Sequence, residues 1–335
     1  MEKSLVPISV VIPTRNQAKF LKRCLASLFK QNAYPQEIVI IDNDSWDETK
    51  KVIDFFKKKL PIRYFWEKKV GYVFARNRGL YESKGKITAF LDSDCLPDKN
   101  WLKNIWNSHQ SHKDSVIQGR WDNFLVKNSL SSNLYFFSLE LYKKTLLSSL
   151  RDNFSDESQK KQDKKFLSIN FIDTKNVSFP KNLIIKKKIA FDNSLPHSED
   201  VDFGLQLLKK KIAIIYNPKI RVRHLVEKDF IGYWRMNFQI GLAKPILTSK
   251  WKLDEIKKEK ISNSLLHYWD KSRKKFISNQ EKIFLKEFLK GRKFFYIRIF
   301  LIFACLRKTT QTLGKAVRLF EVNLEKIRLI ISINL

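Results

Sequence analysis

The stretch Ile87-Thr-Ala-Phe-Leu-Asp92-Ser-Asp94 decides how this sequence folds, because a short apolar run ends in two carboxylates. An apolar run of this length between polar segments predicts a buried β-strand. Side chains at i and i+2 of a strand share one face, so Asp92 and Asp94 can approach one cation. Carboxylate oxygens suit Mg²⁺ or Mn²⁺, with phosphate or water completing the coordination. The stretch therefore predicts a strand-end site for a divalent ion.

Three more strand-length apolar runs precede this stretch, at residues 8–12, 38–41 and 62–65. Apolar residues at helical spacing predict one helix over 20–29 and another over 74–82. Regular alternation of strand and helix predicts an α/β fold with right-handed crossovers. We therefore expect a Rossmann-like, mainly parallel central sheet flanked by helices.

The helix after the second strand has a start signal of its own, because Ser45 followed by Glu48 predicts a capping box. Polar clusters follow three of the strands, at residues 13–16, 42–47 and 92–98. The carboxyl ends of parallel strands meet at one edge of the sheet, where ligands bind in open α/β folds. The three clusters are therefore predicted to line one cleft.

The second half of the chain is less regular. Residues 127–165 are rich in Ser and Lys and predict an irregular excursion, after which a helix begins near Glu199 and a strand covers 212–216. Residues 246–335 hold 21 Lys and Arg against 8 Asp and Glu, on a helical pattern. The sequence thus predicts a main domain over residues 1–245 and a C-terminal basic helical region over 246–335.

The whole chain carries 65 Lys and Arg against 34 Asp and Glu, a net charge of +31. Such an excess attracts anions, namely phosphorylated substrates, anionic lipid headgroups or nucleic acid. An apolar seam over 313–331, in steps of four and three residues, predicts a packing surface. Its partner is either the main domain or a membrane or protein surface, and basic residues near an anionic bilayer each contribute roughly 1 kcal/mol.

The cysteines and the hydropathy pattern indicate where in the cell the protein is located. Cys24, Cys95 and Cys305 lie far apart, which predicts neither a disulfide framework nor a zinc site and favours a reducing environment. The sequence has no signal-peptide core and no run of about 20 apolar residues. We expect a cytoplasmic protein that is peripheral on the cytoplasmic face of a membrane.

Two charged clusters and one histidine point to chemistry. Arg76 and Arg78 lie near the start of a predicted helix, where anions bind, although solvated arginines need no ligand. Glu199-Asp200-Val-Asp202 opens another helix, and carboxylates stabilise helix N-termini without any further role. Asp200 is alternatively a general base that takes the proton of an incoming hydroxyl. His224, taken alone, is as readily structural as functional.

Five motifs in this order resemble glycosyltransferase family 2, which has the GT-A fold, over about residues 7–245. The motifs are Val11-Ile-Pro13-Thr14-Arg15-Asn16, Ile41-Asp42-Asn43-Asp44-Ser45, Ala75-Arg76-Asn77-Arg78-Gly79, Leu91-Asp92-Ser-Asp94 and Ser198-Glu199-Asp200-Val-Asp202. The resemblance implies that residues 1–245 form a GT-A catalytic domain. It implies an inverting transfer of a sugar from a nucleotide-diphosphate donor, commonly a UDP-sugar, to a hydroxyl of a glycan or lipid-linked acceptor.

The resemblance also implies roles for residues on the donor side. Pro13, Thr14 and Arg15 would line the nucleotide pocket, and Asp42 would contact the base, commonly uracil. Arg76 would lie near the nucleotide and its phosphates. All five therefore belong to the predicted donor pocket.

Further roles follow for the metal and for the reaction itself. Asp92 would face the ribose or the metal, and Asp94 would hold Mg²⁺ or Mn²⁺ against the diphosphate. His224 matches a histidine that ligates the metal in some members, and Asp200 takes the position of the catalytic base. The acceptor-side residues implied are Asn176, Glu199 and Trp234.

The sequence departs from the family pattern at one loop, where Asn43 replaces a frequent Asp and Asp44 stands where Gly is common. A nucleotidyltransferase shares a similar sheet but usually carries a Gly-rich phosphate loop, which residues 11–16 lack. The Gly-rich motifs of Rossmann dehydrogenases and P-loop enzymes are absent as well. A nucleic-acid-binding function rests on the net charge alone, so we expect no nucleic-acid partner.

Overall fold

The computed structural model describes residues 4–152, 167–251 and Thr312. They divide into two compact units. Of the described residues, the first unit comprises 4–126, 146–152, 167–193 and 199–226, and the second comprises 127–145, 194–198 and 227–251. No helix in the described part of the chain is both long and apolar enough to cross a membrane.

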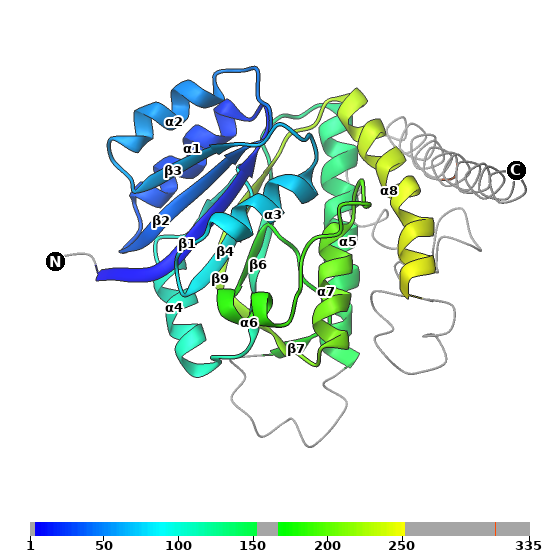
Figure 1. Cartoon of the computed structure of the whole chain (residues 1–335). Helices are drawn as coiled ribbons and strands as arrows, with labels where there is room; N and C mark the ends of the chain where they lie inside the picture. The colour runs from blue at the N-terminus through cyan, green and yellow to red at the C-terminus, as the bar shows by residue number, and fades with distance from the viewer. Residues whose placement is uncertain (1–3, 153–166, 252–311, 313–335) are drawn as a thin grey trace, which may run out of the picture. The chain divides into compact units, whose positions relative to one another are not determined.

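The strands and helices follow one another along the chain as Figure 1 shows. The strands are β1 (Ser4–Thr14), β2 (Ala33–Asp42), β3 (Ile62–Trp66), β4 (Ile87–Leu91), β5 (Cys95–Pro97), β6 (Val116–Leu125), β7 (Leu167–Ile169), β8 (Asn176–Pro180) and β9 (Ile214–Val226). The helices are α1 (Ala18–Phe29), α2 (Thr49–Lys57), α3 (Tyr72–Glu82), α4 (Trp101–Ser111), α5 (Leu130–Asp152), α6 (Lys181–Lys186), α7 (Glu199–Lys209) and α8 (Phe230–Trp251).

Within the described residues, the strands of the first unit form one sheet in the order β3-β2-β1-β4-β8-β6-β9-β5, with β7 on β9. The first four strands are parallel, as the sequence predicts. The other half is mixed, because β8 runs antiparallel to β4 and β6, and β5 and β7 run antiparallel to β9. The mainly parallel arrangement that we expected therefore holds for the N-terminal half of the sheet.

The parallel strands form the centre of the first unit, where the apolar parts of β1, β2 and β4 are buried on both faces. The edge strand β3 is only partly buried. Right-handed crossovers put α1 and α2 on one face and α3 on the other, because the chain reverses its direction across the sheet after β3. In Figure 1, α3 and α6 lie in front of the sheet. Gly79 allows α3 to lie close to β1, since a Cβ there would come within 2.2 Å of Val11 Cγ1.

The start of α2 differs from the predicted capping box. Ser45 instead uses its backbone N–H to bond the carboxylate of Asp42 at 3.0 Å, and its hydroxyl accepts the backbone N–H of Asn16. The oxygen at the helix start comes from Asp47, which accepts the Thr49 backbone N–H at 3.0 Å. The spacing of Ser45 and Glu48 correctly predicts a helix here, but the side chain that accepts the N–H at its start is Asp47.

The predicted irregular excursion over 127–165 is wrong for its first part, because α5 occupies Leu130–Asp152. Its serines include the cap: Ser129 Oγ accepts the backbone N–H of Ser132 at 3.2 Å, three residues on. A Ser-rich segment can therefore start a helix as well as form a loop.

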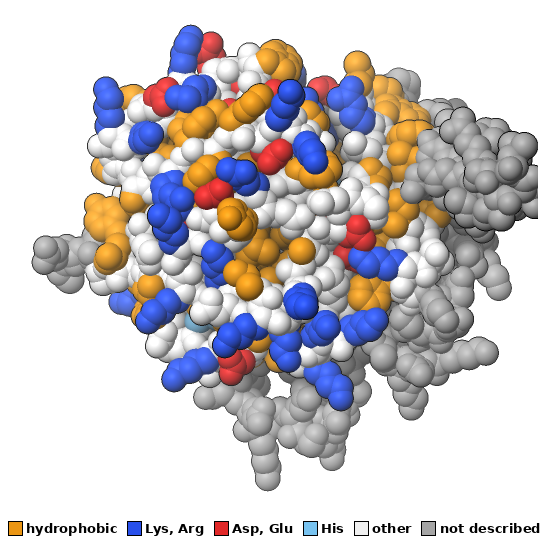
Figure 2. Space-filling view, viewed as in Figure 1, with side chains coloured by type: hydrophobic (Ala, Val, Ile, Leu, Met, Phe, Trp, Pro, Cys, Tyr) orange, Lys and Arg blue, Asp and Glu red, His pale blue; other side chains and the backbone are white. Residues whose placement is uncertain are grey.

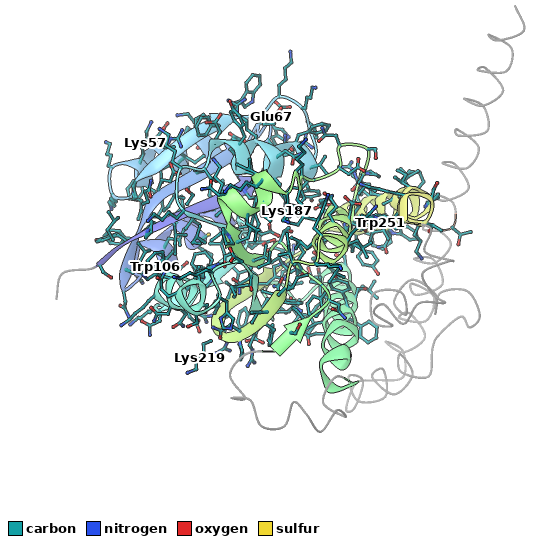
Figure 3. The ribbon with its side chains drawn as sticks, turned by 60° about the horizontal axis from the view of Figure 1, so that its bottom comes forward. Lys57, Glu67, Trp106, Lys187, Lys219 and Trp251 are labelled. Atoms are coloured by element: carbon teal, nitrogen blue, oxygen red, sulfur yellow. The ribbon has the colours of Figure 1, made fainter. Side chains whose placement is uncertain are left out.

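The strand predicted over 212–216 is longer, since β9 continues to Val226. Its second half alternates buried and exposed residues, with Ile220 and Val222 inside and Arg221 and Arg223 outside. Figure 3 shows Lys57 at the end of α2 and Lys187 after α6, and both residues are exposed. Basic side chains thus occupy the solvent side of this unit.

In the second unit, α8 runs without interruption across residue 245, with Pro245 inside it. The predicted boundary at that residue therefore falls inside a helix, and the division into 1–245 and 246–335 stays a prediction. The apolar seam over 313–331 lies outside the described residues.

Candidate active site

The predicted nucleotide pocket lies at the carboxyl ends of β1 and β2, where Thr14 pairs in register with Asp42. Thr14 is buried, and its hydroxyl has no hydrogen-bond partner among the described residues. Pro13 is buried as well, whereas Arg15 is exposed. The structure therefore brings these side chains to one sheet edge, as the sequence predicts.

Hydrogen bonds from its own loop and from β3 hold the Asp42 carboxylate. One carboxylate oxygen accepts the Ser45 backbone N–H at 3.0 Å, and the other accepts the Tyr64 hydroxyl at 3.2 Å. Burial and the neighbouring Asp42 carboxylate raise the pKa of Tyr64 to about 12, so its hydroxyl remains a donor at neutral pH. Asp42 is thus a fixed carboxylate with lone pairs left for a ligand N–H.

Asn43 organises the rim of this pocket, a role that the sequence did not reveal. Its amide nitrogen donates to the carbonyl oxygens of Glu67 and Lys69, at 3.1 and 2.7 Å. Its oxygen accepts the backbone N–H of Gly71 at 2.8 Å, where α3 begins. Gly71 has φ of 146°, which favours glycine. An amide both donates and accepts here, which the carboxylate more common at this position could not do.

Arg76 joins the two sides of the site. Its guanidinium is buried, forms an ion pair with Glu199 at the start of α7, and reaches Asp92 at 3.2 Å. Burial opposes its charge, but Glu199 and Asp92 more than offset this and raise the pKa of Arg76. Its Nε is buried without a hydrogen-bond partner among the described residues. Arg78 is by contrast half-exposed and pairs with Glu82 at 3.0 Å.

The two strand-end carboxylates follow β4. Burial raises the pKa of Asp92; the Arg76 guanidinium opposes this rise and Asp94 adds to it. Asp94 faces His224, with 3.5 Å between its carboxylate and Nε2. The pairing of β5 with β9 explains this contact, since Cys95 lies opposite His224. The structure therefore joins two residues that the sequence separates widely.

His224 is oriented by a contact on the ring nitrogen that does not face Asp94. It is buried, and its Nδ1 lies 2.8 Å from the side-chain oxygen of Asn123 on β6. This contact orients the ring so that Nε2 lies toward Asp94. A metal-binding imidazole is typically held in this way by a partner on its other nitrogen. Asn123 is a second functional candidate that sequence patterns do not reveal.

These groups fit a divalent ion that shares its coordination with a ligand. Among the described residues, no group of three or more His, Cys, Asp or Glu side chains could enclose a metal. Asp94 and His224 offer an oxygen and a nitrogen, which Mn²⁺ accepts. Mg²⁺ and similar ions commonly use one or two protein ligands, with phosphate and water completing the shell.

The first turn of α7 carries the predicted base. Asp200 is partly buried, and one carboxylate oxygen accepts the adjacent Val201 backbone N–H at 2.8 Å. Burial, with Glu199 and Asp173 beside it, raises the pKa of Asp200 from 3.8 to about 7. Phe203 anchors the helix by stacking on Phe191, with ring centroids 4.6 Å apart. The carboxylate is therefore set to accept a proton near neutral pH.

The structure places the three predicted acceptor-side residues in different surroundings. Glu199 is engaged by Arg76, as described above. Asn176 is buried, and its amide group bonds Trp101 Nε1 and the carbonyl oxygens of Arg120 and Ile220. Trp234 lies on α8 of the second unit, with its ring 5.6 Å from that of Phe230. The acceptor roles of all three stay predictions.

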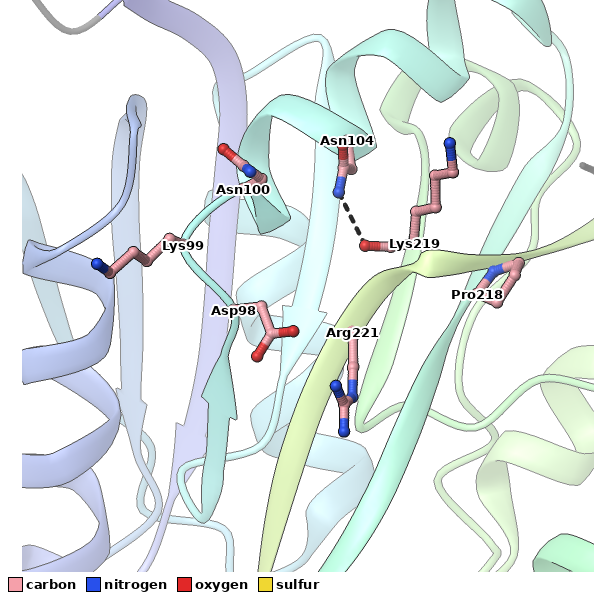
Figure 4. Close-up of a pocket in the computed structure, with 7 residues that line it drawn as sticks. All are labelled: Asp98, Lys99, Asn100, Asn104, Pro218, Lys219 and Arg221. Atoms are coloured by element: carbon pink, nitrogen blue, oxygen red, sulfur yellow. Dashed lines mark hydrogen bonds between the residues drawn. The ribbon is translucent and has the colours of Figure 1, made fainter.

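A separate hollow lies beyond β5 and is shown in Figure 4. It is lined by Asp98, Lys99, Asn100, Asn104, Pro218, Lys219 and Arg221. β5 separates it from the strand-end site, because Asp94 precedes this strand and Asp98 follows it. Its side chains are partly or fully exposed. The hollow is thus distinct from the carboxylate cluster, and its residues serve as controls below.

The sheet with a strand-end carboxylate pair, a neighbouring imidazole and a helix-borne carboxylate is the arrangement that the resemblance to the GT-A fold implies. The glycosyl transferase family 2 model matches residues 9–176. The chain therefore belongs to glycosyl transferase family 2 and is a glycosyltransferase.

Individual relatives and solved structures agree with this assignment. A dolichyl N-acetyl-α-D-glucosaminyl phosphate 3-β-D-2,3-diacetamido-2,3-dideoxy-β-D-glucuronosyltransferase of Methanococcus voltae is 26% identical over 253 residues, covering 72% of this chain and 74% of its own. Several other relatives are matched over about a third of their length or less.

Two solved structures share the fold. A Pyrobaculum calidifontis mannosyltransferase in complex with GDP-Man and Mn²⁺ has a TM-score of 0.59 and 13% identity, covering 96% of this chain and 90% of its own. TarS 1–349 of S. aureus in complex with UDP-GlcNAc has a TM-score of 0.54 and 15% identity, covering 92% and 90%. Both confirm the GT-A fold that the sequence predicts.

Proposed function

We propose that this glycosyltransferase moves a sugar from a UDP-sugar to a hydroxyl of a glycan or lipid-linked acceptor, with inversion at the anomeric carbon. One observation carries the proposal: Arg76 links Asp92 after β4 to Glu199 on α7. The strand-end carboxylates and Asp200 therefore share one site. Inversion needs a leaving-group site and a base on opposite sides of the sugar. The carboxylates after β4 would lie at the leaving group, and Asp200 would supply the base.

The donor side binds the nucleotide. The Asp42 carboxylate would accept the N3–H of uracil, and the Thr14 hydroxyl, which has no partner among the described residues, would reach the nucleotide with Pro13 and Arg15 beside it. The unpartnered Nε of Arg76 supports a role near the phosphates. GT-A neighbours in complex with UDP-GlcNAc and with GDP-Man support a nucleotide-sugar donor of this class.

A divalent ion completes the donor side. Asp94 and His224 would hold it, with Asp92 adjacent, and the ion would neutralise the charge that develops on the leaving diphosphate. Asn123 fixes the His224 ring so that Nε2 faces the site. Mn²⁺ in the structure of the Pyrobaculum calidifontis mannosyltransferase supports a divalent ion at this site.

Asp200 acts on the acceptor. Its carboxylate takes the proton of the attacking hydroxyl as the new C–O bond forms, which is general base catalysis. The raised pKa of Asp200 supports this role, because a base works best when its pKa lies near the working pH. Glu199 keeps the first turn of α7 in place through Arg76.

The acceptor would lie at an anionic membrane surface, to which the protein attaches peripherally from the cytoplasm. The net charge of +31 supports this, and Figure 2 shows many more Lys and Arg than Asp and Glu side chains on the viewed face. The Methanococcus voltae relative is named for a dolichyl phosphate-linked acceptor, which supports a lipid-linked substrate.

A thermal-shift screen tests the donor and the metal together. UDP, GDP and their common sugar conjugates are added with and without Mn²⁺, because a ligand at 100 times its Kd stabilises by about 2.7 kcal/mol. We expect stabilisation by UDP and one or more UDP-sugars that depends on Mn²⁺. Asp94→Asn should abolish this dependence, while Asp98→Asn, beyond β5, should keep it. A screen without any nucleotide effect would overturn the proposal.

A further inference from the structure

The ends of α6 and α7 carry nearly the same sequence, which neither the fold nor the proposed reaction explains. Ile184-Ile-Lys-Lys-Lys-Ile-Ala190 covers the end of α6, and Leu207-Leu-Lys-Lys-Lys-Ile-Ala213 covers the end of α7. The two copies also share their backbone geometry. In each, the N–H of the sixth residue bonds the carbonyl oxygen of the first, at 3.1 Å in α6 and 3.0 Å in α7. Both helices therefore end in a Schellman turn.

The last lysine of each copy occupies a position that is unfavourable for lysine. Lys188 has φ of 51°, and Lys211 has φ of 56°. A Schellman turn usually has glycine or asparagine at this position, because a residue with a longer side chain is strained in the left-handed region. Basic residues favour helix C-termini, but Lys186 and Lys209 already lie in the two last turns. The placement of Lys188 and Lys211 therefore points to a role for their charge outside the helix.

Tertiary contacts bring the two copies together with the start of β4. Gln206, near the end of α7, donates from its side chain to the Ala190 carbonyl oxygen at 2.8 Å. The Lys181 N–H at the start of α6 bonds the Lys86 carbonyl oxygen at 3.0 Å. All of these segments belong to the first unit. They carry exposed lysines that form what we call the lysine surface, namely Lys84, Lys86, Lys186, Lys187, Lys188, Lys210 and Lys211.

The segments of the lysine surface contain little negative charge. Residues 81–86, 181–190 and 206–211 include one acidic residue, Glu82, whose side chain is 14% exposed and pairs with Arg63 and Arg78. Figure 2 shows Lys and Arg side chains gathered around the position of α6, which Figure 1 labels. The lysine surface is therefore a local concentration of positive charge.

Two apolar side chains lie among these lysines. Tyr81 is 78% exposed and Ile185 is 52% exposed. Lys181 lies between them, because its Nζ bonds the Tyr81 carbonyl oxygen at 3.1 Å and Ile185 follows it by one turn of α6. An aromatic and an aliphatic side chain in a basic surface are typical of proteins that lie in the interface of an anionic bilayer.

We propose that the lysine surface attaches this protein to an anionic lipid bilayer, with Tyr81 and Ile185 entering the headgroup region. The inference rests on the proposed function, which places a lipid-linked acceptor at such a membrane. The lysines attract anionic headgroups, and the two apolar side chains leave water on binding. A nucleic acid would be attracted by the same charges but would gain nothing from Ile185.

The position of the lysine surface suits the proposed reaction. Lys86 precedes β4 and Asp92 follows it, so a five-residue strand of roughly 17 Å separates the surface from the metal side. A bilayer at the lysine surface therefore leaves the nucleotide pocket open. α7 carries Asp200 in its first turn and ends at the lysine surface, roughly 15 Å further along the helix. A lipid headgroup that bears sugars can span this distance to the base.

Vesicle binding by the full-length chain tests the proposal. Wild type and Lys188→Asn/Lys211→Asn are mixed with vesicles of phosphatidylcholine alone or mixed with phosphatidylserine, and sedimentation measures the bound fraction. We expect wild type to bind only the vesicles that contain phosphatidylserine. A lysine near an anionic bilayer contributes about fivefold in affinity, so the double variant should bind roughly 25-fold more weakly. Asparagine suits the left-handed position, so the Tm of this variant should be equal to or higher than that of wild type.

Lys57→Asn/Lys58→Asn is the matched control. These exposed lysines lie at the end of α2, on the other face of the sheet from α3 and α6, and their replacement removes the same charge. We expect this control to bind vesicles within about twofold of wild type, because charges beyond a Debye length from the bilayer are screened. Equal losses in the two double variants would show that net charge alone is responsible, and would overturn the proposal.

Ile185→Ser separates a bilayer from a nucleic acid. We expect it to weaken binding to the anionic vesicles and to leave any binding of single-stranded RNA unchanged. RNA binding that depends on Lys188 and Lys211, with vesicle binding that depends on neither, would assign the lysine surface to nucleic acid and overturn the proposal. Lys84→Gln/Lys86→Gln, outside both helix ends, provides a second measurement if the helix-end variant does not fold.

Stabilisation by UDP with Mn²⁺ is measured on the same samples, because the two proposals can fail separately. We expect it to be equal in wild type and in all of these variants. Nucleotide stabilisation without any vesicle binding by wild type would overturn the membrane surface alone. Vesicle binding that depends on Lys188 and Lys211, without any nucleotide effect, would overturn the proposed function alone.

Discussion

Arg76 and Glu199 form a buried ion pair between α3 and α7, although 123 positions separate them in the chain. The same guanidinium reaches Asp92 at 3.2 Å, so one side chain joins the carboxylates after β4 to the helix that carries Asp200. A buried ion pair adds little net stability compared with an apolar pair, but removing one partner typically costs about 3–5 kcal/mol. The pair therefore sets the geometry of the site more than the strength of the fold.

Glu199→Gln tests this relationship. The amide keeps the size of the side chain and removes one of the two charges that compensate Arg76. Because Asp92 still pairs with Arg76, we expect the free energy of unfolding to fall by about 3 kcal/mol, the lower end of the range for a broken buried pair. We expect transfer to fall more than donor affinity, because the first turn of α7 loses its tie. Chemical denaturation and kinetics measure the two effects. Glu48→Gln, at an exposed pair with Lys51, should change neither. Equal behaviour of the two variants would contradict the role of Glu199.

Asp200→Asn tests the base through activity. The pKa of Asp200 is raised to about 7, chiefly by burial. The base works in its ionised form, so kcat/KM of the wild type should fall as pH decreases through this value. The variant should retain donor binding, lose about 10²–10⁴-fold in transfer, and show no such pH limb. A variant with the wild-type pH profile would remove Asp200 from the reaction.

The same substitution should stabilise the protein above neutral pH. In the unfolded chain Asp200 ionises near 3.8, whereas in the folded protein it holds its proton to about 7. The folded state therefore binds more protons between these values, and wild-type stability falls as pH rises through them. Asparagine carries no such penalty. After allowance for solvent screening we expect a gain on the order of 1 kcal/mol at pH 8 and none at pH 4. Melting curves at both values decide this.

The parallel half of the fold was readable from the sequence because its signals are local. Each of the strands β1 to β4 contains a short run of largely apolar residues, and the connecting helices bury apolar residues at helical spacing. The mixed half was not, because the pairing of β8 with β4 joins residues almost ninety positions apart. The sequence does not predict α5, because a Ser-rich segment favours a loop, whereas in the structure Ser129 caps the helix.

The site was readable where a motif carries the chemistry, as for Asp92, Asp94 and Asp200. The sequence does not predict a residue whose role depends only on the neighbours that the fold places beside it. Asn123 has no motif of its own, and its contact with His224 depends on the parallel register of β6 with β9. Asp44, a departure from the family pattern, has φ of 62° at the loop tip. Asp is among the residues that tolerate this left-handed conformation, which accounts for its place there.

Asn123→Leu tests whether His224 is held for metal binding. Leucine is close in size but cannot accept from Nδ1, so the imidazole loses its fixed orientation. Loss of such a partner typically weakens metal affinity 10–100-fold, and we expect this shift in the Mn²⁺ concentration that supports activity. Asn104→Leu is the control, because its amide bonds the Lys219 carbonyl oxygen in the separate hollow. Unchanged Mn²⁺ dependence in Asn123→Leu would argue against His224 as a ligand.

Gly79→Ala tests whether the close approach of α3 to β1 positions Arg76. An alanine Cβ would lie 2.2 Å from Val11 Cγ1, so α3 must shift or Val11 must move. We expect a loss of about 1–3 kcal/mol in the free energy of unfolding, as for other overpacked cores, together with weaker nucleotide binding. Gly204→Ala in α7 is the matched control, because its Cβ would meet nothing nearer than 3.6 Å. Alanine also has the higher helix propensity, so the control should be neutral or more stable by up to about 1 kcal/mol. Equal stability of both variants would show that α3 can retreat from β1 without cost.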